Sequence, residues 1–192
     1  VRKLVVLADS EQGIGAVQAR LMLWPEKEKI NSLGNVTHFL GFGYTEGYRE
    51  KMTNDTCPLK PWRRGEFPMT KEICYPSGAA VLFKAEVLKK VGLFDEEFWM
   101  YNEDQDLGWR IWLAGYRCVL APDAAVYHKY EFSRSITKYY WLDRNRVIAI
   151  LKNYHFGTLI LISPAFILME IGLMFFAYKN GWFYEKIKVY NY

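Results

Sequence analysis

Acidic side chains are concentrated in one short stretch of the chain, WMYNEDQDLGWR at residues 99–110, directly after a tryptophan and a tyrosine. Glu103 and Asp104 are adjacent, and Asp106 follows. Neighbouring carboxylates repel each other, and aromatic rings remove them partly from water. A carboxylate that a helix N-terminus keeps ionised beside an apolar wall can serve as a general base toward a hydroxyl. The stretch is therefore a candidate for proton abstraction.

Carboxylates at a helix start also have a structural explanation. The helix dipole favours negative charge there by about 0.3–1 kcal/mol for each acid. We prefer this explanation for Asp106, but it accounts less well for the adjacent pair Glu103 and Asp104. A glycoside hydrolase is disfavoured, because adjacent acids on one turn cannot lie on opposite sides of a bond, about 5 Å or more apart.

The acidic stretch opens a predicted helix, EDQDLGWRIWLAG. Leu107, Ile111 and Ala114 fall on one face, acids fill the first turn, and Gly115 ends the helix. We expect Trp109 and Trp112, which lie within this helix, to belong to the core rather than to a ligand site.

Strands and a further helix surround this predicted helix. AAVLF, residues 79–83, is typical of a buried strand, and KAEVLKKV is a helix that Gly92 ends. RCVLAP and AAVYH are predicted to be two short strands. This order of elements indicates an α/β domain.

The first third of the chain has weaker signals. The opening residues, with Leu4, Val5 and Leu7, resemble the tail of a helix, and a strand is predicted at Ala16–Leu23, before Pro25. Residues 31–70 are rich in Gly, Pro, Asn and Thr and are expected to be irregular. Long ordered loops of this kind are often functional.

Composition sets broad limits on the protein class. With 192 residues, 51% of them hydrophobic, the chain is expected to form one globular unit, and global disorder is excluded. A net charge of +4 is too small to indicate nucleic-acid binding. Cys57, Cys74 and Cys118 lack the spacing of a zinc site and are expected to be free thiols in a reducing compartment. No signal peptide is recognised.

The C-terminal segment has a different composition. Residues 156–178 carry a single charge, Glu170, and are long enough to span a bilayer as a helix. Because Glu170 is costly in a membrane and Pro164 would kink the helix, we expect a pair of helices at the membrane interface. Trp182, Tyr184 and the lysines that follow would anchor them. The alternative is a buried helix packed on the domain or on a partner.

The order of signals over residues 77–128 resembles the C-terminal half of the catalytic domain of family 2 glycosyltransferases, in particular their rhamnosyltransferase-like branch. The shared pattern is a Ser-Gly-Ala strand, a helix ending in Gly-x-Phe-Asp, a Glu-Asp-x-Asp helix start, Ala-Gly-Tyr, and a Pro-led strand ending in His. All parts are present in this order. A weaker likeness covers DRNRVIAILKNY, residues 143–154, and the apolar end of the chain.

The resemblance implies a fold and a reaction. The fold would be a partial GT-A fold, a doubly wound α/β sheet that binds a sugar nucleotide at the C-terminal ends of its strands, followed by apolar helices. The reaction would be inverting transfer, in which Asp104 deprotonates the acceptor hydroxyl while the nucleoside diphosphate leaves opposite. Glu103 would orient Asp104 or bind acceptor hydroxyls. This role requires Asp104 to face an open cleft shared with His128.

The same resemblance implies that His128 helps to hold a divalent metal, Mg²⁺ or Mn²⁺. The alternative is a strand-end histidine that is hydrogen-bonded to backbone. Arg144 and Arg146 could pair with diphosphate oxygens, or equally with lipid head groups or solvent. Trp99 and Tyr101 could stack on a sugar. The candidate substrate-binding residues are Gly78, Ala79, Trp99, Tyr101, Arg144 and Arg146.

The resemblance also has a gap. No counterpart is found for the donor-binding half of such transferases, with its metal-ligating Asp-x-Asp motif. We therefore expect a fragment or a truncated protein that is inactive alone. Residues 1–155 would form the C-terminal half of a GT-A domain, and residues 156–192 a membrane-associated helical tail.

The expected partners follow from this assignment. They are a nucleotide-sugar donor, a glycan or lipid-linked acceptor for polysaccharide biosynthesis, and a membrane surface, with homo-oligomerisation left open and nucleic acid excluded. The expected location is cytoplasmic, at the inner face of the cell membrane. The alternative function is a non-catalytic, membrane-peripheral interaction module that keeps a transferase-like fold.

Overall fold

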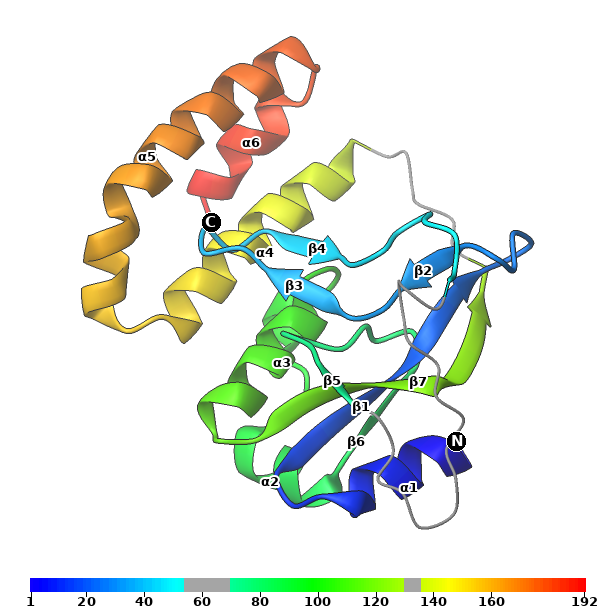
Figure 1. The fold of residues 1–192 in the computed structure, drawn as a ribbon. Coiled ribbons are helices and arrows are strands. Elements are labelled where there is room, and N and C mark those ends of the chain that lie inside the picture. Colours follow the sequence, from blue (N-terminus) through cyan, green and yellow to red (C-terminus); the bar gives the residue numbers. More distant parts are fainter. Residues whose placement is uncertain (54–69, 130–135) are drawn as a thin grey trace. The chain divides into compact units, whose positions relative to one another are not determined.

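The computed structural model describes residues 1–53, 70–129 and 136–192. They fall into two compact units (Figure 1). The first unit comprises Val1–Thr37, Gly43–Asp95 and Asp104–Glu131. The second comprises His38–Phe42, Glu96–Glu103 and Phe132–Tyr192.

The first unit is built on a mixed sheet whose central strand is β1 (Ile14–Leu23). Along one edge β1 pairs in parallel with the long strand β7 (Arg117–His128), and β5 (Lys71–Glu72) pairs antiparallel with β7. β2 (Ile30–Ser32) and β6 (Val81–Phe83) pair antiparallel with different parts of β1. The α/β class predicted from the sequence is confirmed.

Helices cover both faces of this sheet because its central strands are apolar on both faces (Figure 1). In β7, Cys118 and Leu120 pack into a core with α2 (Ala85–Val91) and α3 (Glu103–Leu113). The alternate residue Val119 packs on the opposite face with α1 (Arg2–Ser10). The period of two along β7 therefore divides the core into two layers.

Three predicted helices are confirmed. The opening helix tail corresponds to α1, the segment that Gly92 ends corresponds to α2, and the acidic helix corresponds to α3. Gly92 and Gly115 have φ values of 88° and 84°, which L-residues with side chains rarely adopt. These glycines allow the chain to turn out of α2 and α3, as their positions in the sequence predicted.

The prediction of two strands, RCVLAP and AAVYH, was wrong. β7 runs without interruption from Arg117 to His128. Its pairing with β1 jumps from Ala121 to Ala125, and Pro122 lies within this irregularity. Proline has no N–H to donate, so it interrupts the ladder as a bulge without ending the strand.

Residues 31–53 are more regular than predicted. Besides β2 they contain a two-stranded sheet of β3 (Asn35–Thr37) and β4 (Gly43–Thr45). The apolar run at 79–83 contributes only Val81–Phe83 as a strand, and these residues are half-buried. Three-residue strands are too short to show a hydrophobic period. The remainder of the predicted irregular region, 54–69, lies outside the described residues.

The second unit consists mainly of three helices, α4 (Thr137–Asn153), α5 (Phe156–Lys179) and α6 (Phe183–Tyr190). The short helix α6 packs against both α4 and α5 (Figure 1). The apolar tail thus belongs to the same compact unit as α4, which begins well before the boundary expected at residue 156.

Pro164, where the sequence predicted a kink, lies within one continuous helix of 24 residues, so it does not divide α5 into two helices. Proline cannot donate to the carbonyl four residues earlier, which here belongs to Ile160. The Ser163 hydroxyl donates to that carbonyl at 2.8 Å. The side chain next to the proline therefore satisfies the backbone acceptor that the proline leaves open.

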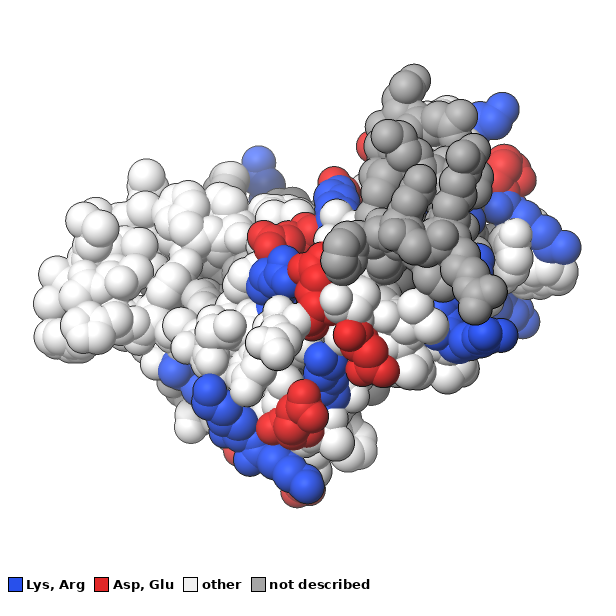
Figure 2. Space-filling model, turned by 60° about the horizontal axis from the view of Figure 1, so that its bottom comes forward, with Lys and Arg blue, Asp and Glu red and all other residues white. Residues whose placement is uncertain are grey.

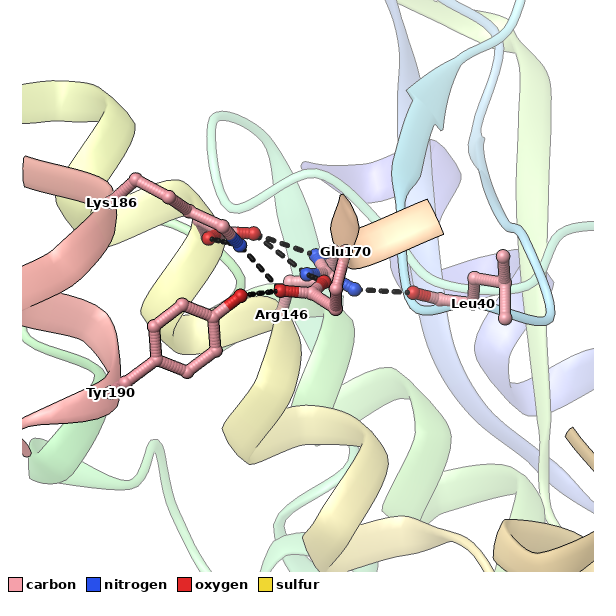
Figure 3. Close-up of polar contacts among 6 residues, drawn as sticks. Leu40, Arg146, Glu170, Lys186 and Tyr190 are labelled. Atoms are coloured by element: carbon pink, nitrogen blue, oxygen red, sulfur yellow. Dashed lines mark hydrogen bonds and ion pairs between the residues drawn. The ribbon is translucent and has the colours of Figure 1, made fainter. Parts of the chain in front are cut away.

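Glu170 of α5 lies in a buried ionic cluster with Arg146 of α4 and with Lys186 and Tyr190 of α6 (Figure 3). Glu170 is 9% exposed, and Lys186 is fully buried. Lys186 Nζ lies 2.5 Å from a Glu170 oxygen. Burial alone would raise the pKa of Glu170, but the hydrogen bonds from Lys186 and Tyr190 and the charge of Arg146 outweigh it and lower that pKa.

Asp143 of α4 completes this cluster. It accepts from Lys186 at 2.5 Å and from Arg146 Nη2 at 2.7 Å, so that two acids face two cations. Arg146 also donates to the backbone carbonyl of Leu40 at 3.1 Å (Figure 3). Burial disfavours the charge of Lys186, but Asp143 and Glu170 outweigh it and raise the pKa of this amine. We refer to these contacts as the Glu170 cluster.

The expected anchoring role of the residues after α5 is wrong for two of them. Trp182 is 4% exposed and stacks on Tyr139 with ring centroids 4.9 Å apart. Lys186 is occupied in the Glu170 cluster. Tyr184, by contrast, is 72% exposed, and Lys188 is partly exposed. Lys186 is buried while Lys188 is not, because the buried charge of Glu170 in α5 requires a cation from α6.

Candidate functional site

Asp104 lies in the first turn of α3 and is half-buried. One carboxylate oxygen accepts from the Gln105 N–H at 2.8 Å, and the other accepts from the Gly78 N–H at 3.3 Å. Backbone N–H groups at a helix start favour the ionised form of a carboxylate. The structure thus places Asp104 beside Gly78, which lies in the turn before β6.

The backbone opposite Asp104 is exposed as far as the described residues go. Gly78 and Ala79 are exposed, and a Cβ on Gly78 would meet no atom of residues 1–53, 70–129 or 136–192 within 4 Å. The preceding residue, Ser77, donates its N–H to the buried Gln18 side chain at 2.6 Å. A ligand could therefore approach this turn without displacing a side chain.

Gln105 holds the start of α3 from inside the first unit. Its side chain is fully buried and donates to the Thr37 hydroxyl at 3.2 Å. Gly108 allows α3 to approach the chain closely, since a Cβ there would lie 2.3 Å from Tyr75 Cβ. Neither residue was singled out in the sequence, because a polar or small residue within a helix carries no pattern of its own.

The other two acids of the stretch differ from Asp104. Glu103 is half-buried, and its Oε2 atom is buried without a hydrogen-bond partner in the described part of the chain. Asp106 is fully buried and accepts from Arg110 Nε at 2.8 Å. Arg110 also donates to the carbonyl of Val91, the last residue of α2. Asp106 therefore has a structural role, as the sequence suggested, but its partner is an arginine four residues later.

The segment before α3 has an unusual backbone. Trp99, Tyr101 and Asn102 have φ values of 54°, 67° and 63°, in the left-handed region that residues with side chains rarely adopt. Trp99 is 74% exposed and Tyr101 is half-buried. Strain of this kind persists only where surrounding contacts hold it, and it occurs often at functional sites.

Asn145 of α4 supplies such contacts. Its fully buried amide nitrogen lies 2.7 Å from each of the carbonyl oxygens of Phe98, Met100 and Tyr101. Its own oxygen accepts from Arg144 at 3.0 Å. The resemblance pointed to this helix, but it did not single out Asn145. Its role depends on a segment that is more than 40 residues away in the chain.

Arg144 and Arg146 are both buried and have protein partners. Arg144 forms an ion pair with Glu97 and donates to the Glu97 carbonyl at 2.9 Å. Arg146 belongs to the Glu170 cluster. These contacts give both arginines structural roles, and contact with a diphosphate stays a prediction.

His128 ends β7, as predicted, and its Nδ1 lies 3.0 Å from Asn31 Oδ1 of the first unit. In the tautomer with its proton on Nδ1, the ring would donate to this amide oxygen, and Nε2 would be the nitrogen for a metal. Within residues 1–53, 70–129 and 136–192, no group of three or more His, Cys, Asp or Glu side chains could hold a metal ion. His128 could thus supply one ligand of a shared site.

The thiols within the described residues show no reactive environment. Cys74 and Cys118 are free, as expected, and Cys57 lies outside the described residues. Cys118 is fully buried, and burial raises the pKa of its thiol to about 12.

Comparisons with known proteins identify relatives of the chain. The family model described as "Glycosyltransferase like family 2" matches residues 3–146. The N-acetylglucosaminyl-diphospho-decaprenol L-rhamnosyltransferase of Mycobacterium tuberculosis, in two strains, is 39% identical over 77 residues. That match covers 37% of this chain and 25% of the relative, so the chain corresponds to a small part of the curated protein.

A solved structure shows a weaker likeness. The crystal structure of GalNAc-T7 with UDP, GalNAc and Mn²⁺ superposes with a TM-score of 0.47 and 13% identity. The superposition covers 74% of this chain and 28% of the other.

Proposed function

Because the chain belongs to the glycosyltransferase-like family 2, whose model matches residues 3–146, we propose that its parent protein is an inverting glycosyltransferase. It transfers a sugar from a nucleotide-diphospho-sugar to an acceptor hydroxyl. The name of the mycobacterial relatives supports a lipid-linked acceptor and a deoxysugar such as rhamnose. In this proposal the donor-binding half of the enzyme lies outside residues 1–192.

The environment of Asp104 carries the proposal. Its carboxylate lies at the start of α3, is half-exposed, and is hydrogen-bonded to the amide of Gly78 at an open turn. A carboxylate held in place by amides can accept a proton from a hydroxyl that approaches along that turn. Asp104 thus acts as the general base, and the attacking oxygen gains nucleophilicity as its proton moves to the carboxylate.

Four residues have supporting roles in the proposal. Glu103, which is half-buried next to Asp104 in the chain, orients Asp104 or accepts a hydrogen bond from an acceptor hydroxyl. Trp99 and Tyr101 provide aromatic surfaces for a sugar, and both have a left-handed backbone conformation. Arg144 acts on the site through Asn145 and Glu97.

A divalent metal forms part of the proposed reaction. His128 would provide one nitrogen to it, with its ring oriented by Asn31. A divalent ion held there would supply positive charge for the leaving diphosphate. The remaining ligands would come from the diphosphate and from outside the described residues.

Replacement of Asp104 tests the proposal in the full-length protein. Asp104→Asn keeps the shape of the side chain but cannot accept the proton, so transfer should fall by about 10²–10⁴-fold. Metal-dependent binding of the nucleotide sugar, measured by calorimetry, should be unchanged. Asp123→Asn, in the bulged part of β7, is the matched control and should retain full activity.

The same measurement separates the alternatives. Undiminished transfer by the Asp104→Asn protein would show that another group is the base. If the unaltered full-length protein binds no nucleotide sugar, the proposal fails and a non-catalytic interaction module at the inner face of the cell membrane takes its place. Ultracentrifugation of the same samples tests homo-oligomerisation.

A further inference from the structure

Helix α5 exposes a continuous apolar face. Six aliphatic or aromatic side chains are between 58% and 79% exposed, although no other part of the described chain covers them. They are Ile160, Leu161, Ile167, Leu168, Ile171 and Phe175. Their spacing of three, four and seven residues places them on one side of the helix. An apolar face of this length is far larger than soluble surfaces usually present to water.

Another side of α5 packs on the second unit, where it contacts α6. Glu170 and Ala177, seven residues apart, are the two buried residues of α5 and lie on one stripe. The Glu170 cluster neutralises the only charge between Phe156 and Tyr178 with a lysine and an arginine from the same unit (Figure 3). The helix therefore has one side that binds protein and one side that binds nothing in this chain.

The exposed side does not resemble a protein interface. Such interfaces have an apolar centre and a polar rim. The part of the surface formed by α5 is almost free of charged side chains (Figure 2). In addition, the Ser163 hydroxyl satisfies the carbonyl that Pro164 leaves open, as a helix in hydrocarbon requires. These features fit a lipid bilayer better than a second protein.

We propose that α5 lies in the plane of one bilayer leaflet, with its Leu161 and Leu168 side in the acyl chains and its Glu170 side facing the protein. The inference deepens the proposed function, because it places the second unit at the surface where a lipid-linked acceptor is found.

The Glu170 cluster argues against a spanning orientation. By length and composition α5 could cross a membrane, being about 36 Å long at 1.5 Å per residue. Glu170 would then lie well inside the hydrocarbon core, and its contacts would bring Lys186 and α6 to the same depth. α6 also carries Glu185 and Lys188, and each charge costs about 2.5–3.5 kcal/mol in the bilayer centre. In the plane of the membrane, these groups remain on the aqueous side.

Vesicle flotation tests the docking face. The 192-residue chain should float with neutral phosphatidylcholine vesicles, also at high salt, because the contact is apolar. Leu161→Ser combined with Leu168→Ser should lower the partition coefficient by about tenfold or more, given about 1.5–3 kcal/mol per buried leucine. The matched control is Leu93→Ser combined with Leu113→Ser. These two leucines of the first unit are 70% and 65% exposed, and their replacement should not alter flotation.

Labelling tests the orientation. Lys152→Cys and Lys179→Cys place a thiol near each end of α5 at exposed positions. When the protein is added to sealed vesicles, a membrane-impermeant thiol reagent outside should modify both sites equally, as read by peptide mass spectrometry. A spanning helix would instead protect one site until detergent is added, which would overturn the in-plane orientation.

The remaining outcomes are also decisive. Unchanged flotation of the double serine variant would overturn the lipid-facing surface. A dimer in the absence of lipid that the same variant dissociates would show that a second copy covers α5. Transfer to a water-soluble acceptor by the full-length protein, with Asp104 intact, measures the proposed function separately, so either idea can fail without the other.

Discussion

Two carboxylates, one in each compact unit, have opposite surroundings. Asp104 is half-exposed and accepts hydrogen bonds from the backbone amides of Gly78 and Gln105. Glu170 is buried and accepts from Lys186, Arg146 and Tyr190. Amides orient a carboxylate at an open turn and leave it in contact with solvent, whereas cations stabilise the ionised form of a buried carboxylate and lower its pKa.

The different surroundings of Asp104 and Glu170 suit different roles, proton transfer in one case and stabilisation of the fold in the other. Proton transfer requires a carboxylate that an incoming hydroxyl can reach and that can exchange its proton. A buried ion pair instead ties distant elements together, because removal of one partner leaves an uncompensated charge. Asp104 meets the first requirement, while Glu170 connects α4, α5 and α6.

The largest effect on stability is expected at Glu170. Glu170→Gln leaves two buried cations with only Asp143, so the free energy of unfolding of the chain should fall by about 3–5 kcal/mol. Asp104→Asn keeps one of the two side-chain oxygens that accept from the Gly78 and Gln105 amides, and because the site is only half-buried the loss should be about 1 kcal/mol. Urea denaturation measures both, and equal losses would remove the distinction between the two carboxylates.

Asn145 sharpens the comparison, because it lies in the unit of Glu170 but holds the backbone that leads into Asp104. Asn145→Ala removes a buried donor from three carbonyls and should destabilise the chain by about 2–3 kcal/mol. Amide hydrogen exchange should accelerate at Trp99–Asn102. Exchange that stays slow there would show that other contacts hold the left-handed backbone. Asn153→Ala, a buried asparagine later in α4, is the matched control.

A smaller net effect is expected when both charges are removed. Glu170→Leu with Lys186→Met leaves the Arg146 and Asp143 pair intact and should cost only about 1 kcal/mol, far less than either single change. A double-mutant cycle from urea denaturation gives the coupling energy. Additive losses would show that Glu170 and Lys186 do not act as a pair.

The smallest effect is expected on the pH dependence of the free energy of unfolding. The pKa of Glu170 is lowered from 4.5, so its contribution to stability is complete above that value and is lost as the pH falls through the lowered folded-state pKa. Asp143 and Arg146 from α4, and Lys186 and Tyr190 from α6, face it. Unfolding from pH 6 to pH 2 should therefore depend less on pH in Glu170→Gln than in the parent chain. Identical slopes would contradict this account.

Much of the fold follows from local patterns. The helix of residues 103–113 could be predicted because acids, an apolar stripe and Gly115 mark its start, its buried face and its end. The strand β1 could also be predicted, because Pro25 marks the end of the segment Ala16–Leu23. β7 was divided incorrectly at Pro122, because a bulge and a strand end look alike until the partner strand is known.

The candidate site was predictable in part for the same reason. Asp104 and Gly78 were singled out from the sequence and the family resemblance, and the structure shows a hydrogen bond between them, while their roles stay predictions. Asn145 was not found, since its acceptors are carbonyl groups, which have no sequence signature. The left-handed backbone of Trp99 could not be predicted either, because in a sequence such positions are usually recognised by a glycine.

The sequence by itself determined the local elements, the acidic helix start and the apolar segment that carries Glu170, because these depend on neighbours within a few turns. Only the tertiary structure decided that Pro164 leaves α5 intact and that Lys186 and Trp182 turn inward. The physical reason is that a buried charge is stable only beside its counterion, and the counterions of Glu170 lie 16 and 24 residues away along the chain.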